Sequence, residues 1–202
     1  MAEKRLPILE SFYSLQGEGY NVGVAAYFIR LAGCNVRCPW CDTPNSWDIA
    51  SGELRKIEDI VNEAVETGAK NVVITGGEPL IHNLDELTTL LKSCGLKVWL
   101  ETSGSAPLSG VFDWICLSPK KWYLPENDEI FKRANELKVV VESEEDFIFA
   151  QECKGRAGGQ TILSLQPQWS ADELIASKIV DFIKQNPEWR LSLQTHKYLN
   201  IR

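Results

Sequence analysis

The stretch Asn71-Val-Val-Ile-Thr75-Gly76-Gly77 decides the fold class of this chain. Its unbroken apolar, β-branched run is typical of a strand buried on both faces, and the two glycines mark where that strand ends. The segment just before it carries apolar residues at the spacing of one helix face: Ile57, Ile60, Val61, Ala64 and Val65. A helix followed by a buried strand is the repeating unit of a parallel α/β sheet.

The same alternation continues along the chain. Further apolar runs of strand length lie at 24–31, 97–101, 113–117, 137–141, 161–165 and 190–194, and further helical patterns lie at 84–94, 144–151 and 171–185. Segments 45–54 and 102–112 are too short or too polar for a crossover helix. A complete (β/α)8 barrel needs about 250 residues. We therefore predict an α/β fold, a trimmed, partial (β/α) barrel of six to seven mostly parallel strands with fewer helices, as one domain over 1–202.

Composition narrows the classes of function. The 202 residues carry a formal net charge of −7 and no block rich in lysine or arginine, which argues against nucleic acid as a partner. No apolar run approaches the roughly 20 residues that cross a bilayer, and no apolar segment of a secretory signal follows Met1. Six cysteines are too few and too uneven for a disulfide scaffold. We expect a cytoplasmic protein that acts without membrane or nucleic acid.

Three of the cysteines crowd together in Cys34-Asn-Val-Arg-Cys38-Pro-Trp-Cys41. Iron–sulfur clusters are held by thiolates, usually four, so three protein thiolates leave one iron of a [4Fe–4S] cluster open to a small molecule. A structural zinc ion is the alternative, and it would need a fourth ligand such as His82, His196 or a distant cysteine. None of these stands at a spacing that indicates zinc.

The spacing C-x3-C-x2-C, with Trp40 before its last cysteine, resembles the signature of the radical S-adenosylmethionine (SAM) superfamily. Gly76-Gly77-Glu78-Pro79, after a buried strand, resembles the motif that holds the SAM amino group in that superfamily. Glycines permit close approach of a ligand and a carboxylate can accept an ammonium. The resemblance implies a partial barrel of the radical SAM type and these SAM-binding residues: Trp40, Asp42, Gly77, Glu78, Ser118, Lys120, Gln166 and Gln168.

A narrower resemblance covers nearly the whole chain. Leu15-Gln16-Gly17-Glu18-Gly19, the segment 28–34, Cys41-Asp42-Thr43 and the segment 194–197 are similar to the 7-carboxy-7-deazaguanine synthase family. The resemblance implies a carbon–nitrogen lyase of queuosine biosynthesis that contracts 6-carboxy-5,6,7,8-tetrahydropterin to 7-carboxy-7-deazaguanine with release of ammonia. SAM would be regenerated, and Mg²⁺ would assist at Thr43. The implied substrate-binding residues are Leu15, Gln16, Gly17, Arg30, Thr75 and, through the chain terminus, Arg202.

The residue types suit these roles. The planar fork of Arg30 matches the two oxygens of a substrate carboxylate, and one hydroxyl plus that carboxylate suffices for Mg²⁺, which keeps several waters. His196 is open between a rim residue and a site residue. The resemblance also implies a homodimer reduced by flavodoxin or ferredoxin.

Two alternatives remain at this point. One is an activating enzyme that places a glycyl radical on a partner protein, which would share the cysteine and GGEP motifs. The other is a non-enzymatic iron–sulfur or zinc module, such as an electron carrier, although four protein ligands would serve a carrier better.

Overall fold

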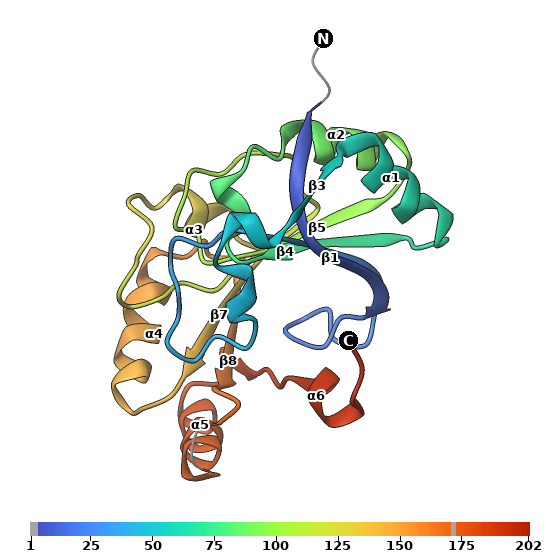
Figure 1. Ribbon diagram of the computed structural model, residues 1–202. Helices are drawn as coiled ribbons and strands as arrows, with labels where there is room; N and C mark the ends of the chain where they lie inside the picture. The colour runs from blue at the N-terminus through green and yellow to red at the C-terminus, as the bar shows by residue number, and fades with distance from the viewer. Residues whose placement is uncertain (1–3, 171–172) are drawn as a thin grey trace.

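The computed structural model describes residues 4–170 and 173–202, in which nine strands form one sheet in the order β3-β1-β2-β4-β5-β6-β7-β8-β9 (Figure 1). The strands are β1 (Arg5–Leu15), β2 (Ala25–Leu31), β3 (Glu53–Lys56), β4 (Asn71–Gly76), β5 (Lys97–Thr102), β6 (Trp114–Leu117), β7 (Glu136–Val141), β8 (Ile162–Pro167) and β9 (Trp189–Leu191). The helices are α1 (Ile57–Glu66), α2 (Asp85–Ser93), α3 (Glu129–Arg133), α4 (Glu145–Arg156), α5 (Glu173–Gln185) and α6 (Thr195–Leu199).

The predicted fold class is confirmed. Each of the seven predicted strands corresponds to a strand of the parallel run from β2 to β9, and segment 102–112 contains no helix. The two further strands, β1 and β3, pair antiparallel at one edge, where exposed polar residues of β3 hid the strand from the hydrophobic pattern. The predicted helix 171–185 is observed from Glu173, and residues 171–172 lie outside the described ranges.

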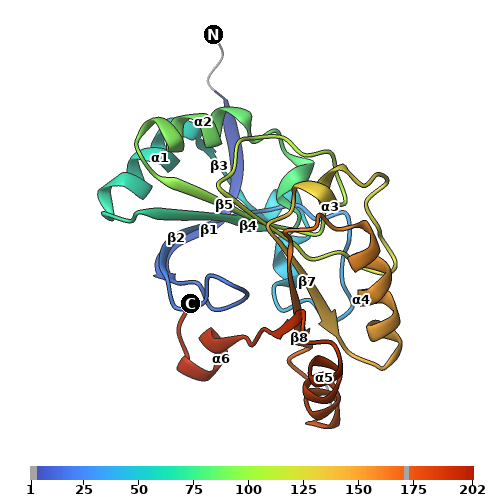
Figure 2. The same ribbon diagram turned by 180° about the vertical axis from the view of Figure 1, so that it is seen from behind.

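Helices cover one face of the curved sheet and leave the other face open (Figures 1 and 2). The main core lies between the sheet and α1, α2, α4 and α5, and includes fully buried Leu87, Leu91, Ile74 and Ile179. Burying such a side chain contributes about 1.5–3 kcal/mol. Helices α3 and α6 were missed by the sequence because five residues are too few to show a helical period.

Along the direction of its strands, the open, concave face of the sheet has an apolar part followed by a polar part. An apolar group fills the end where the parallel strands begin: Phe12, Phe28, Val73, Trp99 and Trp114. Because side chains two residues apart share a face, the next inward positions on β2, β4 and β5 are polar: Arg30, Thr75 and Glu101. The apolar group fills one end of the barrel, so the polar groups that a ligand could contact lie toward the carboxyl ends of the strands.

The β1–β2 loop and α6 lie together across the open side of the barrel, near the C-terminus (Figures 1 and 2). The Thr195 amide donates a 2.8 Å hydrogen bond to the Gly17 carbonyl. These two segments therefore cover a region that the sheet itself does not close.

Candidate active site

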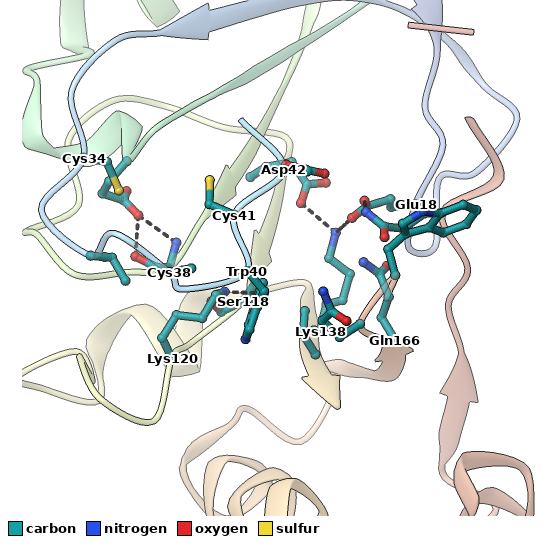
Figure 3. A pocket seen from close by; sticks show the side chains of 18 of the residues that line it. Glu18, Cys34, Cys38, Trp40, Cys41, Asp42, Ser118, Lys120, Lys138 and Gln166 are labelled. Carbon is teal, nitrogen blue, oxygen red and sulfur yellow. Dashed lines mark hydrogen bonds and ion pairs between the residues drawn. The ribbon is translucent and has the colours of Figure 1, made fainter. Parts of the chain in front are cut away.

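The cysteine segment leaves the end of β2 and turns across the carboxyl edge of the sheet. The Cys34 amide donates to the Trp47 carbonyl at 3.1 Å, and the Cys41 amide donates to the Cys38 carbonyl at 3.0 Å. Cys34, Cys38 and Cys41 are all half-buried and line one cavity (Figure 3). Burial raises the pKa of the Cys38 thiol, and the nearby Lys120 ammonium opposes that rise.

The donor set fits an open-iron cluster. Among the described lining residues of this cysteine cavity, the three cysteines have no fourth cysteine or histidine beside them. Within residues 4–170 and 173–202, no three cysteine, histidine, aspartate or glutamate side chains converge on a point that would hold one metal ion. A cluster attaches its cysteines to different irons, so it does not require such convergence.

Gly76 and Gly77 allow β4 to run against the cysteine segment. A Cβ on Gly77 would lie 2.3 Å from the Gly33 carbonyl oxygen and 2.7 Å from Cys34 Cβ. The Gly77 amide donates to the Leu31 carbonyl at 3.0 Å, which continues the pairing of the strand ends. The glycines therefore allow two segments of the protein to pack closely together. The sequence analysis explained them only by the close approach of a ligand.

Glu78 is 1% exposed and ties the end of β4 to the end of β5. One carboxylate oxygen accepts the Leu80 amide at 3.0 Å and the Thr102 hydroxyl at 2.5 Å. The other accepts the Ser103 amide at 2.8 Å and the Ser103 hydroxyl. Four donors thus hold the carboxylate that forms this part of the cavity wall.

The cysteine cavity contains every residue predicted to bind SAM: Trp40, Asp42, Gly77, Glu78, Ser118, Lys120, Gln166 and Gln168. Figure 3 shows Lys120 beside Trp40 and Ser118, with Glu18 and Gln166 farther along. The Lys120 ammonium donates to the Ser118 hydroxyl at 2.9 Å and lies 5.8 Å from the centre of the Trp40 ring. Burial lowers the pKa of Lys120.

A second cavity adjoins the first. We call it the arginine cavity. It contains every residue predicted to bind the substrate: Leu15, Gln16, Gly17, Arg30, Thr75 and Arg202. His196 lines it too, and the ring of His196 packs on Gly17, where a Cβ would lie 2.3 Å from Nδ1. The two cavities share Glu18, Asp42 and Glu101. Ligands in the two cavities would therefore meet at these three side chains.

The two arginines of the arginine cavity share one carboxylate. Arg30 Nε donates to Glu10 at 2.8 Å, and Arg202 donates to the other oxygen of Glu10 at 2.6 Å. The Ser14 hydroxyl donates to the Arg202 carbonyl, and the Arg202 guanidinium lies 5.3 Å from the Phe12 ring centre. Two guanidinium groups from opposite ends of the chain are thus placed in one cavity.

The chain covers nearly the full length of several relatives. A 7-carboxy-7-deazaguanine synthase from Flavobacterium psychrophilum is 50% identical over 97% of this chain and 92% of its own length. One from Synechocystis is 48% identical over 97% of this chain and 93% of its own length. The chain belongs to the 7-carboxy-7-deazaguanine synthase family. The wider match agrees, because residues 28–116 fit the model of the Radical SAM superfamily.

The family is also supported by the fold. The crystal structure of QueE from Escherichia coli superposes with a TM-score of 0.83 at 35% identity, over 95% of each chain. Membership in the 7-carboxy-7-deazaguanine synthase family confirms the predicted family and separates the chain from both alternatives, the glycyl-radical activating enzyme and the non-enzymatic module. A radical SAM family implies a [4Fe–4S] cluster and SAM as cofactors, as the sequence predicted.

A buried charged group between the two cavities was missed by the sequence reasoning. The Lys138 ammonium, on β7, donates to Glu18 at 2.7 Å and to Glu101 at 3.0 Å. Gln16 donates to the other oxygen of Glu101 at 3.0 Å, and Gln194 donates to Glu18 at 2.7 Å. The available signal was a single lysine in the otherwise apolar run 137–141. A lysine on a buried strand requires a charged partner.

These contacts shift the pKa values of the three charged groups. Burial raises the pKa of Glu18, but the charge and hydrogen bonds of Lys138 and Gln194 outweigh it and hold that pKa at about 2. Burial, together with the neighbouring Glu18 and Glu136, raises the pKa of Glu101. Burial lowers the pKa of Lys138, but the surrounding acidic groups raise it well above its ordinary value. Lys138 therefore stays charged and fixes the two carboxylates.

Thr43 lies outside the lining of both cavities. Its hydroxyl donates to Asp42 at 3.1 Å, and Asp42 also pairs with Lys197 of α6 at 3.4 Å. Asp42 borders both cavities, so the predicted magnesium ligand is one hydrogen bond away from them.

None of the helices in the described ranges is long and apolar enough to cross a membrane.

Proposed function

We propose that this chain is a 7-carboxy-7-deazaguanine synthase, a radical SAM lyase that converts 6-carboxy-5,6,7,8-tetrahydropterin to 7-carboxy-7-deazaguanine and ammonia in queuosine biosynthesis. The observation that carries the proposal is the junction of the two cavities at Glu18, Asp42 and Glu101. One cavity has the cysteines that a cluster needs, and the other has the cations that an anionic substrate needs.

The cysteine cavity provides the cofactor site. Cys34, Cys38 and Cys41 would hold the [4Fe–4S] cluster, and the predicted SAM residues would hold SAM against it. Once reduced, a cluster held by these cysteines would give one electron to SAM, which would supply a 5′-deoxyadenosyl radical and methionine. Trp40 offers a ring face for the adenine. Lys120 is fixed by Ser118 and adds a positive charge to the same wall.

The arginine cavity provides the substrate site. The guanidinium of Arg30 would pair with the pterin carboxylate, with Glu10 holding its Nε side. Gln16 is held by Glu101 and by the Glu18 amide, and its second amide hydrogen would face the flat polar edge of the pterin. The apolar floor beneath excludes water from the reacting carbon.

A magnesium ion would be held by Thr43, with the substrate carboxylate supplying further oxygens. Mg²⁺ keeps several waters and takes few protein ligands, so a single hydroxyl beside Asp42 is consistent with this role.

The remaining partners belong to the same proposal. Exposed Tyr198 and Leu199 of α6, with the Trp169 ring 5.2 Å from that of Tyr198, form apolar surface that supports a homodimer. Flavodoxin or ferredoxin would reduce the cluster. All six cysteines are free thiols, which supports a reducing compartment, the cytoplasm. One sheet running from β1 to β9 supports a single domain over residues 1–202.

The test is an anaerobic assay. The protein is reconstituted with iron and sulfide, reduced, and mixed with SAM, Mg²⁺ and 6-carboxytetrahydropterin. We expect 7-carboxy-7-deazaguanine to form without stoichiometric loss of SAM. Cleavage of SAM with the pterin returned unchanged would overturn the substrate assignment. No change in either compound, in a sample with verified cluster, would overturn the radical SAM reaction itself.

A further inference from the structure

The β1–β2 loop forms part of the wall of the arginine cavity. It connects two strands in one half of the sheet, but residues from the other half hold it in place. Gln16, Gly17 and Glu18 line that cavity. The loop leaves β1 near one edge of the sheet and reaches β7 and Ser192, the residue after β9, near the other edge. Within residues 4–170 and 173–202, no strand pairing links β1 directly to β7, β8 or β9, so single contacts hold the loop: the hydrogen bond from the Thr195 amide to the Gly17 carbonyl, and side chains of this far half of the sheet.

Glu136, the first residue of β7, provides the main anchor. It is 1% exposed, and both of its carboxylate oxygens accept the Tyr20 amide, at 3.2 and 3.0 Å. The Ser164 hydroxyl of β8 donates to the same carboxylate at 2.7 Å. A buried carboxylate is costly unless hydrogen bonds satisfy it. The donors to Glu136 are the Tyr20 amide of the loop and the Ser164 hydroxyl. Lys138, two residues later on β7, donates to Glu18 and Glu101 instead.

Gly19 shows how closely the loop is seated on this carboxylate. Its φ is +67°, and a Cβ there would lie 2.8 Å and 2.9 Å from the two oxygens of Glu136. Both the left-handed backbone and the contact exclude a side chain. Gly19, the last residue of the Gln-Gly-Glu-Gly motif, is therefore required for contact with Glu136, which lies more than a hundred residues later in the sequence.

Ser192 is a second anchor on the same loop. Its hydroxyl accepts the Gly19 amide at 2.9 Å and donates to Gln166 at 2.8 Å. Gln166 lines the cysteine cavity. One serine thus connects the loop of the arginine cavity to a wall residue of the cysteine cavity.

We propose that Glu136 is a positioning residue for the substrate, a buried carboxylate that holds the Gln16–Tyr20 segment in the orientation that the pterin requires. Glu136 is not among the described residues that line either cavity, so it acts through the loop. The inference rests on the proposed function, because it names the role of this residue in that reaction. Glu18 lines both cavities and directly precedes the anchored amides of Gly19 and Tyr20, so loss of the anchor would displace Gln16 and Glu18 together.

The experiment compares Glu136→Ala and Glu136→Gln with the wild-type holoenzyme. Ser164→Ala is the matched control, since it removes one donor to Glu136 and leaves both contacts with Tyr20. We expect Glu136→Ala to raise the pterin KM by about tenfold or more, because hydrogen bonds to a charged group are lost. The absorption spectrum of the cluster should stay at the wild-type value, and SAM cleavage without pterin should fall much less than the pterin KM rises, because Glu18 also lines the cysteine cavity. Glu136→Gln, which keeps one acceptor oxygen, should give an intermediate KM, and Ser164→Ala a smaller change.

Hydrogen–deuterium exchange gives a reading that does not depend on the reaction. Peptides covering residues 16–24 should exchange faster in Glu136→Ala, while peptides covering the cysteine segment, residues 33–43, should be unchanged. An unchanged pterin KM in both Glu136 variants overturns the proposal. So does an equal loss of uncoupled SAM cleavage and cluster content, which would indicate a general structural role.

Measurements on the wild type distinguish a failure of this proposal from a failure of the proposed function. If the wild type fails to convert the pterin, the proposed function fails, and exchange in residues 16–24 then decides whether Glu136 anchors the loop. Unchanged exchange there overturns the anchoring role. If Glu136→Ala does not fold, the same comparisons are made with Glu136→Gln.

Discussion

The cysteine cavity and the arginine cavity meet at three residues but are built in different ways. The cluster ligands of the first come from one short segment, the cysteines at 34–41, and its predicted SAM residues lie at or after the ends of β2, β4, β6 and β8. The second is assembled from β1, the β1–β2 loop, the ends of β2, β4 and β5, and the last residues of the chain. Local spacing therefore suffices to identify the cluster ligands, whereas the substrate site depends on segments that only the fold brings together.

Cys38→Ala is expected to have the largest effect and tests the cofactor side of this comparison. The remaining two thiols cannot hold the cluster, so iron content, SAM cleavage and turnover should all be abolished. Iron and sulfide analysis with a SAM cleavage assay measures this. Cys94→Ala, which changes an exposed cysteine outside both cavities, should behave as wild type. Retained SAM cleavage in Cys38→Ala would contradict the cluster assignment.

Lys138→Met tests the charged group between the cavities. Removing the cation leaves Glu18 and Glu101 buried without their partner, which should lower the free energy of unfolding by about 3–5 kcal/mol. Urea denaturation measures the change. The control is Lys154→Met, which breaks the half-exposed pair with Glu188 and should cost no more than about 1 kcal/mol. Equal effects of the two variants would mean that the buried group is not what holds the two cavities together.

Arg30→Ala tests the substrate side alone. The pterin KM should rise by about tenfold to a hundredfold, because a charged hydrogen-bond partner of the carboxylate is lost. The cluster spectrum and SAM cleavage should remain as in wild type. Arg55→Ala is the control, since Arg55 pairs with Glu63 outside both cavities. A wild-type KM in Arg30→Ala would remove this residue from the substrate site.

The smallest expected effect is a difference in pH dependence between wild type and Glu18→Gln. The pKa of Glu18 is about 2 in the folded chain and 4.5 as a free side chain, so its stabilisation is present above pH 4.5 and is lost as the pH falls toward 2. Glu101 has the opposite sign, because its raised pKa makes stability fall as the pH rises through that raised value. Urea unfolding across the acid range should show a steeper acid loss in wild type than in Glu18→Gln. Parallel curves would contradict the Lys138–Glu18 pairing.

Prediction from the sequence succeeded where a pattern is local. The parallel strands, the helices of nine or more residues and the family were found because their signals lie within a few consecutive residues. The predicted SAM residues line the cysteine cavity and the predicted substrate residues line the arginine cavity, with Asp42 in both, and their individual roles stay predictions. The short helices and the polar edge strand β3 were missed because they bury too little apolar surface to leave a period.

The sequence by itself determined the cofactor chemistry and the sheet, because thiolate spacing and hydrophobic periodicity are properties of adjacent residues. Only the tertiary structure decided that Glu18, Glu101 and Lys138 form one buried group, and that Glu136 and Ser192 hold a loop more than a hundred residues earlier in the chain. These contacts join residues that lie far apart in the sequence at no recurring spacing. They are strong because the hydrogen-bonded groups are buried, where the local dielectric constant is low. The place where the two cavities meet is therefore a property of the fold.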